Sequence, residues 1–425
     1  MIKSVFKGDI IHTPTKGEFE IYEDSYLIIE NCKVVKISHQ LEDLYKNYDF
    51  YDFSGKIIIP GFVDVHLHAP QYPNRGLGMD KELIPWLNTY TFPEESKYKD
   101  IEYSRRVFKE FINDIWKEGT TRSAVYSTIF LNSTKLLMDM FIESGLGAYI
   151  GKVNMDRNSA PNLTEDTYES IKDTKELILE YKDRSELVRP IITPRFIPTC
   201  TDELLTELGN LAIEYNIPVQ SHLNENTSEV EWVKELYPNS KNYASVYDDF
   251  SLFGQSKTIM AHCVHNTDEE IDLMADNGVY AAHCPYSNFN LSSGMSPIRE
   301  YLNAGVNVGL GSDISGGHIL SIPRVMVGAI HTSKMVWLQN QKELAPLTLS
   351  EAFYLATKGG GSFFGKVGSF EKGYDSDLLV IDIDNLTTLK TLTPEEKLQK
   401  FIYEGSSDNI IERYVKGKKI ERPYK

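Results

Sequence analysis

The sequence predicts an α/β fold, a closed (β/α)8 TIM barrel, from three features of its central part. Eight short apolar segments, typical of buried strands, recur between residues 59 and 367, and stretches with helical periodicity separate them. No GxGxxG turn follows the first of these strands, which disfavours a doubly wound open sheet. Eight parallel strands can close on themselves and leave no exposed sheet edge. The active face of such a barrel lies at the carboxyl ends of its strands.

The eight predicted strands are apolar, and each is bounded by residues that favour turns. In chain order they are PGFVDVHLHA, TTRSAVYST, GAYIGKVNM, RPIITPRF, IPVQSHL, KTIMAHC, VYAAHCP and VNVGLGSD. Similar runs open the chain, in SVFKGDIIHT, YLIIENCKVVKIS and FSGKIIIPG, and close it, in DLLVIDI and IERYVKGKKI. We therefore expect both ends of the chain to form strands outside the barrel.

Composition and charge narrow the class of protein. The chain has 425 residues, 41% of them hydrophobic, which is enough for one large core with a small appendage. A net charge of −17 repels phosphate backbones and anionic lipid, so neither a nucleic-acid polymer nor a membrane is expected as a partner. The four cysteines are widely spaced, and the sequence has no run of 18 apolar residues and no secretory signal. A cytoplasmic location is predicted.

Metal-binding residue types recur at the ends of the predicted strands. In the first strand the period of two places His66 and His68 on the same side. Five of the ten histidines, and one aspartate, fall at carboxyl ends of strands, which a random scatter would seldom produce; they are His66, His68, His222, His262, His283 and Asp313. Because these ends meet on one face of a barrel, we expect a common site there.

The donor types in this set indicate the metal and its chemistry. Imidazole and carboxylate ligands without thiolate suit Zn²⁺ or Fe²⁺, and we expect zinc, with iron as the alternative. Such an ion lowers the pKa of a bound water from 15.7 to about 7, so hydrolysis is the implied reaction. Glu225 follows His222 by three residues, which places it over the site as a candidate for proton transfer.

Several motifs together resemble the amidohydrolase superfamily, and within it the deaminases of purine bases. They are PGFVDVHLHAPQY, PWLNTYTFPEE, TPRF, QSHLNEN, MAHC, AHCPYSN, GLGSDISGG and EKGYDSDLLVID, and they extend over nearly the whole chain. The resemblance implies that residues 1–58 and 368–425 form a composite β-sandwich and that residues 59–367 form the metal-dependent catalytic barrel. It also implies hydrolytic deamination of guanine to xanthine and ammonia in a homodimeric, cytoplasmic enzyme of purine catabolism.

The resemblance also implies a role for each residue of the site. The metal ligands would be His66, His68, His222 and Asp313, with His262 beside the metal water as an orienting group or an additional ligand. Glu225 would protonate the purine ring nitrogen, and Asp313 would take the proton of the attacking water. The residues expected to bind or support the substrate are Gln71, Trp86, Arg195, Phe196 and His283, the last of these from behind the pocket.

Two of these substrate contacts follow from the chemistry of guanine, whose O6 accepts hydrogen bonds while its N1, N2 and N9 edges donate them. Arg195 suits the carbonyl oxygen and Gln71 the donor edges, while Phe196 and Trp86 would pack on the ring. Core packing is the alternative role for both aromatic residues, and a structural ion pair is the alternative role for Arg195.

Alternatives exist for the number of metal ions, for the substrate and for the class of protein. The fourth strand contains no lysine that could bridge two metals, since Lys152 lies on the third strand, so one ion is expected. Another heterocycle, such as 8-oxoguanine, an adenosine derivative or a triazine, is the alternative substrate, although a pocket for adenine-type substrates has no need of an arginine that donates to O6. A non-catalytic scaffold is the alternative class of protein, but every expected ligand position is filled.

Overall fold

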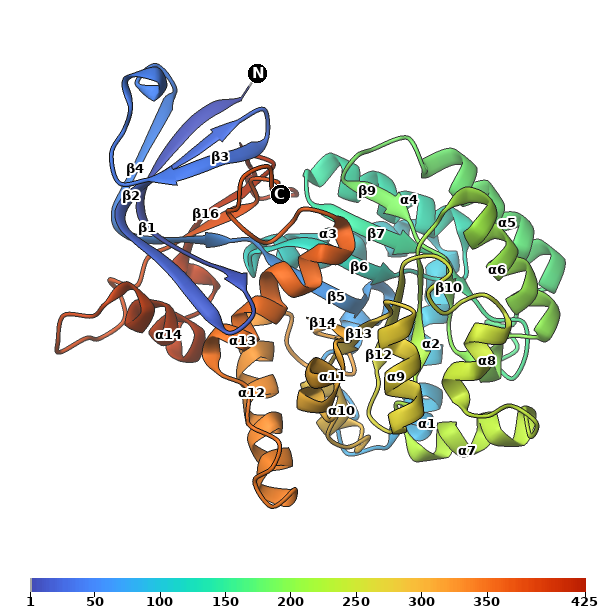
Figure 1. The fold of residues 1–425 in the computed structure, drawn as a ribbon. Helices are drawn as coiled ribbons and strands as arrows, with labels where there is room; N and C mark the ends of the chain where they lie inside the picture. Colours follow the sequence, from blue (N-terminus) through green and yellow to red (C-terminus); the bar gives the residue numbers. More distant parts are fainter. Residues whose placement is uncertain (1) are drawn as a thin grey trace.

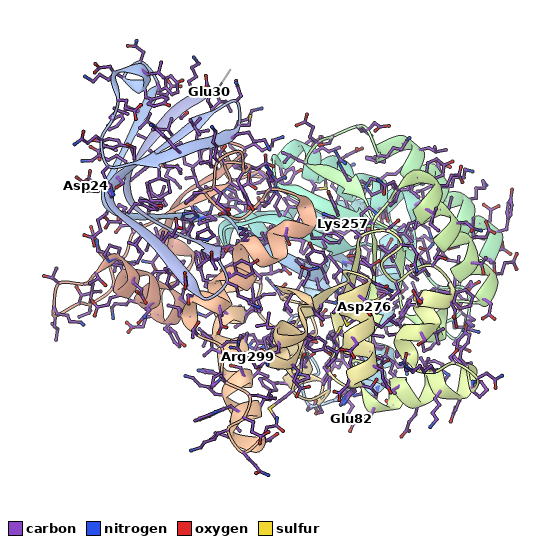
Figure 2. The ribbon with its side chains drawn as sticks, viewed as in Figure 1. Asp24, Glu30, Glu82, Lys257, Asp276 and Arg299 are labelled. Carbon is purple, nitrogen blue, oxygen red and sulfur yellow. The ribbon has the colours of Figure 1, made fainter. Side chains whose placement is uncertain are left out.

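The computed structural model describes residues 2–425, which form a barrel and a β domain beside it (Figure 1). Strands β5 to β14 lie at the centre of the barrel, and helices α4 to α9 follow one another along its outer side. Both chain termini lie at the β domain, where the first strands and the last strands come together. Charged side chains such as those of Asp24, Glu82 and Asp276 are on the outside of the molecule (Figure 2).

The barrel consists of eight parallel strands, and all eight correspond to predicted segments. Their bounds are β5 (Phe62–His68), β6 (Thr120–Tyr126), β7 (Gly147–Gly151), β9 (Val188–Pro190), β11 (Val219–Leu223), β12 (Thr258–His262), β13 (Tyr280–His283) and β14 (Asn307–Leu310). The third and fourth strands continue as β8 (Val153–Asn154) and β10 (Thr193–Pro194), which also pair in parallel. The predicted barrel is therefore confirmed.

Backbone hydrogen bonds join the two halves of the barrel. Strands β5, β6, β7 and β9 form one parallel set, and β11 to β14 form the other. Between the sets, Ile192 N donates to Pro218 O at 2.9 Å and Gln220 N donates to Ile192 O at 2.9 Å. On the opposite side, Asp313 N donates to His66 O at 2.8 Å. The last strand thus meets the first, and this contact joins two predicted metal ligands.

Amphipathic helices cover the barrel because their apolar faces pack on the outer side of the strands. Several begin with a side-chain cap, such as Asp100 before α3 and Thr201 before α6. The helices are α1 (Leu83–Trp86), α2 (Phe92–Glu95), α3 (Ile101–Lys117), α4 (Leu131–Ser144), α5 (Thr167–Tyr181), α6 (Asp202–Tyr215), α7 (Thr227–Leu236), α8 (Tyr243–Asp249), α9 (Asp268–Asp276), α10 (Pro285–Asn290), α11 (Ile298–Ala304), α12 (Ile322–Gln339), α13 (Leu349–Tyr354) and α14 (Pro394–Glu404). Among residues 2–425, none has both the length and the apolarity needed to cross a membrane.

The β domain combines both ends of the chain, as predicted. Its seven strands have the order β17-β16-β15-β4-β1-β2-β3. They are β1 (Lys3–Thr15), β2 (Glu18–Glu30), β3 (Lys33–Ser38), β4 (Asp49–Pro60), β15 (Leu378–Ile381), β16 (Ile410–Val415) and β17 (Lys418–Lys419). Apolar side chains alternate between the two faces, so Phe6 packs near Leu378 while its neighbour Val5 packs near Tyr45. The exact domain boundaries, 58/59 and 367/368, stay a prediction.

A buried ion pair connects the β domain to the barrel. Arg122, near the amino end of β6, donates from Nε to Asp377 Oδ2 at 2.7 Å and from Nη2 to Asp375 Oδ2 at 3.2 Å. Gly147 on β7 leaves space for this arginine, because a Cβ there would lie 2.5 Å from its Cδ. This contact holds the two parts together at the end of the barrel away from the metal-ligand cluster.

Candidate metal centre and active site

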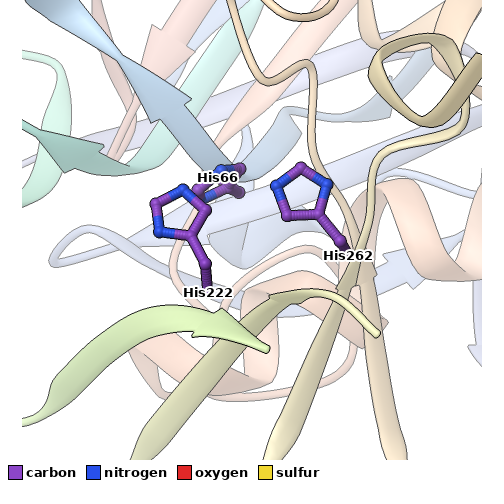
Figure 3. A group of neighbouring side chains, drawn as sticks. All are labelled: His66, His222 and His262. Carbon is purple, nitrogen blue, oxygen red and sulfur yellow. The ribbon is translucent and has the colours of Figure 1, made fainter. Parts of the chain in front are cut away.

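Five of the predicted residues converge at the carboxyl end of the barrel. His66 and His68 alternate with Leu67 on β5, so both imidazoles point to the same side of the strand. His222 lies on β11 and His262 ends β12, while Asp313 follows β14. Figure 3 shows the rings of His66, His222 and His262 turned toward one another from these separate strands.

The ring nitrogens and the carboxylate lie within a few ångström of one another. His66 Nε2 is 3.2 Å from Asp313 Oδ1, and His68 Nε2 is 3.5 Å from the same oxygen. The Nε2 atoms of His68 and His222 are 3.2 Å apart. His262 belongs to the same cluster, since its ring nitrogen lies within 4.8 Å of those of His66 and His222. This is a candidate metal site.

Hydrogen bonds on the outer side of the cluster fix the orientation of two imidazoles. His222 Nδ1 donates to the carbonyl of Arg195 at 2.6 Å, which leaves Nε2 without a proton and facing the cluster. His262 Nδ1 is 3.0 Å from Oδ1 of Asn288, so its Nε2 also faces inward. A fixed tautomer with a free inward lone pair is what a metal ligand requires.

The charges of the cluster fit a bound cation. Burial, together with neighbouring imidazoles, holds the pKa of His68 and of His222 well below the usual range, so both rings are neutral at pH 7. Burial alone would raise the pKa of Asp313, but His66 and its neighbours lower it to about 2. Both ring nitrogens of His66 lack a hydrogen-bond partner among residues 2–425. Converging lone pairs and one carboxylate are stable together around a divalent ion.

Asp64 ties the first strand to the segment after the last one. Its Oδ1 accepts hydrogen bonds from His66 N at 3.2 Å and from Ser312 N at 3.0 Å.

Two cluster residues have left-handed backbone conformations, with φ of 71° at His262 and 46° at Asp313. Such conformations cost free energy in residues other than glycine and are characteristic of functional sites.

Glu225 lies in the loop between β11 and α7, with its carboxyl at the edge of the cluster. Its Oε2 is 3.6 Å from His262 Nε2. Burial raises the pKa of Glu225 well above the usual range, and the negative charges of Asp313 and Glu229 act in the same direction. Glu229 also holds the loop, since its Oε2 accepts from the backbone N of Glu225 at 3.0 Å. This position and the raised pKa fit the predicted role of Glu225 in proton transfer, which stays a prediction.

A cavity opens beside the cluster. Gln71 and Arg195 line it, and both are bonded to Glu95, which lies behind them and is not a lining residue. Arg195, directly after β10, donates from Nη1 to Glu95 Oε2 at 2.6 Å and from Nη2 to Glu95 Oε1 at 3.1 Å. Gln71 Nε2 donates to Glu95 Oε1 at 3.0 Å. Arg195 thus forms the ion pair considered as its alternative role, and it also lines the cavity.

Apolar side chains form the rest of the cavity wall. Trp86 is buried at the end of α1, where its Nε1 donates to Leu77 O at 3.0 Å, and its ring lines the cavity. Phe196 also lines the cavity and contacts Trp232 edge to face, with ring centroids 6.1 Å apart. A cavity with apolar walls and a few fixed polar groups is suited to a flat, polar-edged ring.

The structure places the remaining predicted residue, His283, apart from this cavity. It ends β13, is fully buried, and is not among the lining residues. Burial lowers its pKa to about 3, so the ring is neutral. The role of His283 in supporting the pocket stays a prediction. Lys152 is bonded to Glu165 and Ser170, as expected of a structural residue.

Sequence reasoning missed several groups of the site. Glu95 occurs in PWLNTYTFPEE, but nothing in the spacing of that segment marks a buried carboxylate. Glu229 was detectable, because NTSE fits a capping box in which Asn226 begins the helix and the glutamate bonds back to it. Asn288 carries no local signal, and its role depends on the distant His262.

Comparison with known proteins identifies the class to which this barrel and metal site belong. Residues 57–420 match the model of the Amidohydrolase family, and the chain belongs to that family. It is 41% identical to a guanine deaminase of Dictyostelium discoideum, over 99% of this chain and 98% of that protein. A guanine deaminase of Escherichia coli is 33% identical, over 94% of this chain and 91% of that protein.

A solved structure gives the same result. The crystal structure of guanine deaminase from C. acetobutylicum with bound guanine in the active site has a TM-score of 0.97. The two chains are 52% identical, and the match covers 99% of this chain and 100% of the other. The resemblance inferred from the motifs is confirmed at the level of both sequence and fold.

Proposed function

We propose that this chain catalyses the hydrolytic deamination of guanine to xanthine and ammonia. The observation that carries the proposal is one buried cavity bounded by a histidine–aspartate cluster on one side and by Arg195 and Gln71 on the other. The similarity to proteins named guanine deaminase, at 33 to 52% identity over nearly the whole chain, supports the same substrate.

The ligands of the proposed metal ion are His66, His68, His222 and Asp313, with His262 next to them as an orienting group or a further ligand. The donor set consists of imidazole nitrogens and carboxylate oxygens, which supports zinc, with iron(II) as the alternative. When bound, the ion supplies the Lewis acidity that activates water for hydrolysis at neutral pH. One ion is proposed, because the fourth strand carries no lysine that could bridge two metals, and Lys152 on the third strand is paired with Glu165.

Two carboxyl groups handle the protons of the reaction. Asp313, kept ionised by its histidine neighbours, accepts a proton from the attacking water at Oδ2, the oxygen that lies 3.9 Å from His262 Nε2. Glu225, kept protonated by burial, donates from its carboxyl to the ring nitrogen beside the amino-bearing carbon. Glu225 then carries the proton that Asp313 has taken to the amino group, which leaves as ammonia. The remaining hydroxyl proton of the added water restores the Glu225 carboxyl as the carbon becomes a carbonyl.

Recognition of the base uses the polar side of the cavity. Arg195 donates to O6, and the Oε1 atom of Gln71 accepts from an N–H edge, while Phe196 and Trp86 pack on the ring. An adenine-type ring presents no O6 acceptor, so it would leave a buried guanidinium N–H without a partner. This mismatch favours guanine over adenine.

We also propose a cytoplasmic homodimer. All four cysteines are free, which suits a reducing compartment. Met335 and Leu338 on α12 expose 47% and 55% of their surface, and this helix supplies apolar area that a partner subunit would cover. Size-exclusion chromatography with light scattering tests the dimer, and a mass of one chain would contradict it.

The function is tested by supplying purified, metal-analysed protein with guanine, adenine, cytosine or 8-oxoguanine and measuring ammonia. We expect xanthine from guanine, little product from adenine, and a loss of at least roughly 10²-fold in a Glu225→Gln variant. The substitution keeps the shape of the side chain and removes its acidic proton. Equal turnover of guanine by the wild type and the variant would refute the assigned proton transfer.

A further inference from the structure

We infer that Glu95 is the positioning residue of the base-recognition pocket, where it fixes the orientation of Gln71 and cancels the charge of Arg195. The inference rests on the proposed function and deepens it. Glu95 ends α2, is only 5% exposed, and places its carboxylate between the other two side chains.

The carboxylate determines which end of the Gln71 amide faces the substrate. An ionised carboxylate only accepts hydrogen bonds, so the atom 3.0 Å from Glu95 Oε1 has to be the amide nitrogen of Gln71. Oε1 of Gln71 is then left as an acceptor. Without Glu95 the amide could rotate by 180°, and the pocket would present a donor to the N–H edges of the base.

The same carboxylate, together with a neighbouring ring, holds the guanidinium of Arg195. Both Nη atoms donate to Glu95, at 2.6 and 3.1 Å, in the forked geometry that is most selective for orientation. Phe92, from the same helix, lies with its ring centroid 5.2 Å from the guanidinium carbon. A guanidinium has five N–H groups, so others remain for a carbonyl oxygen of the base.

Because Glu95 neutralises Arg195, it also determines whether the pocket binds a neutral ligand or an anionic ligand more tightly. The ion pair carries no net charge, which suits a neutral base such as guanine. Xanthine, with two carbonyl groups, loses a ring proton more readily than guanine does and is partly anionic near neutral pH. An uncompensated arginine in a buried cavity would attract this anion, so Glu95 favours release of the product over its retention.

The matched pair of variants is Glu95→Gln and Glu94→Gln. Both glutamates lie on α2 and are similarly buried, at 5% and 6% exposure, but Glu94 bonds to Lys97 and Tyr103 instead of the pocket. The assay measures kcat and KM for guanine, and the inhibition constant of xanthine at pH 6 and pH 8. Circular dichroism and thermal melting show whether each variant is folded.

For Glu95→Gln we expect kcat/KM for guanine to fall about 10²-fold. Xanthine should bind at least about tenfold tighter relative to guanine at pH 8, where it is mostly anionic, with a smaller change at pH 6. Glu94→Gln should leave both quantities within about threefold. A purely structural role of Glu95 would weaken guanine and xanthine alike, and that result would overturn the inference, as would a Glu95→Gln variant indistinguishable from Glu94→Gln.

A second variant keeps the test decisive if Glu95→Gln does not fold. Glu95→Asp retains the charge and withdraws the carboxylate by one methylene, so guanine turnover should fall about tenfold without tighter binding of xanthine. Unchanged turnover in this variant would refute the positioning role. Wild-type protein that releases no ammonia from guanine would instead refute the proposed function, and the two failures are therefore distinguishable.

Discussion

Replacement of Arg122 by methionine tests whether the buried ion pair between the barrel and the β domain stabilises the fold. The side chain of Arg122 is 5% exposed and that of Asp377 is 1% exposed. Asp377 Oδ1 also accepts from the backbone N of Lys416 at 2.8 Å, so its position is fixed from both sides. Methionine fills much of the space but leaves the aspartate charge without a cation in a buried place.

Loss of one partner of a buried ion pair costs about 3–5 kcal/mol of unfolding free energy. An unfolding entropy of about 2.1 cal/mol/K per residue, over 425 residues, amounts to about 0.9 kcal/mol/K. A loss of about 4 kcal/mol therefore lowers Tm by roughly 4–5 °C. Arg122 lies near the amino end of β6, away from the metal-ligand cluster, so kcat at 25 °C should be unchanged.

The double variant Arg122→Met/Asp377→Asn is the matched control. It removes both charges, so it should recover part of the stability lost in the single variant. Calorimetry or urea denaturation of the wild type, the single variant and the double variant measures the difference. The reasoning is refuted if Arg122→Met costs less than about 1 kcal/mol, or if the double variant is no more stable than the single one.

Two further predictions concern the metal centre and the barrel core. Treatment with a strong chelator should abolish ammonia release from guanine and lower Tm, because an ion that binds only the folded chain stabilises it. Added Zn²⁺ should restore both the activity and Tm. Full activity in metal-free protein would contradict the assigned ligands. Leu208→Ala, at a fully buried position of α6, should lower the free energy of unfolding by about 2–5 kcal/mol in the same denaturation assay. Its control is Ile213→Ala on the same helix, where the side chain is 55% exposed and the loss should be less than about 0.5 kcal/mol.

The features that could be predicted from the sequence are those with a local signature. Each barrel strand is a short apolar run between turn-forming residues, and all eight runs become strands. The metal-ligand candidates were found because a barrel brings the carboxyl ends of its strands to one face, so strand-end residues such as His66, His222 and Asp313 meet although they are far apart in the chain.

The pocket network could not be predicted in the same way, because its bonds join residues distant in sequence and lying outside regular strands. Glu95 and Arg195 are 100 residues apart. The segment that carries Glu95 contains short turns of helix, whose backbone path depends on tertiary contacts rather than on a repeating pattern. Arg195 could be recognised as a pocket residue from its position after the fourth strand, but its partner could not.

The rigid strand ends of the barrel explain why this site can hold charged and polar groups that burial alone disfavours. Burial lowers the pKa of His68 and of His222 and raises that of Glu225, while the pKa of Asp313 is lowered by its neighbours, all within one enclosed region. Their outward atoms are fixed by backbone or amide groups that belong to the barrel, as for His222 at the Arg195 carbonyl. The free energy of the apolar barrel core opposes the cost of this arrangement, so rigidity at the strand ends is what keeps the site preorganised for a cation and a neutral base.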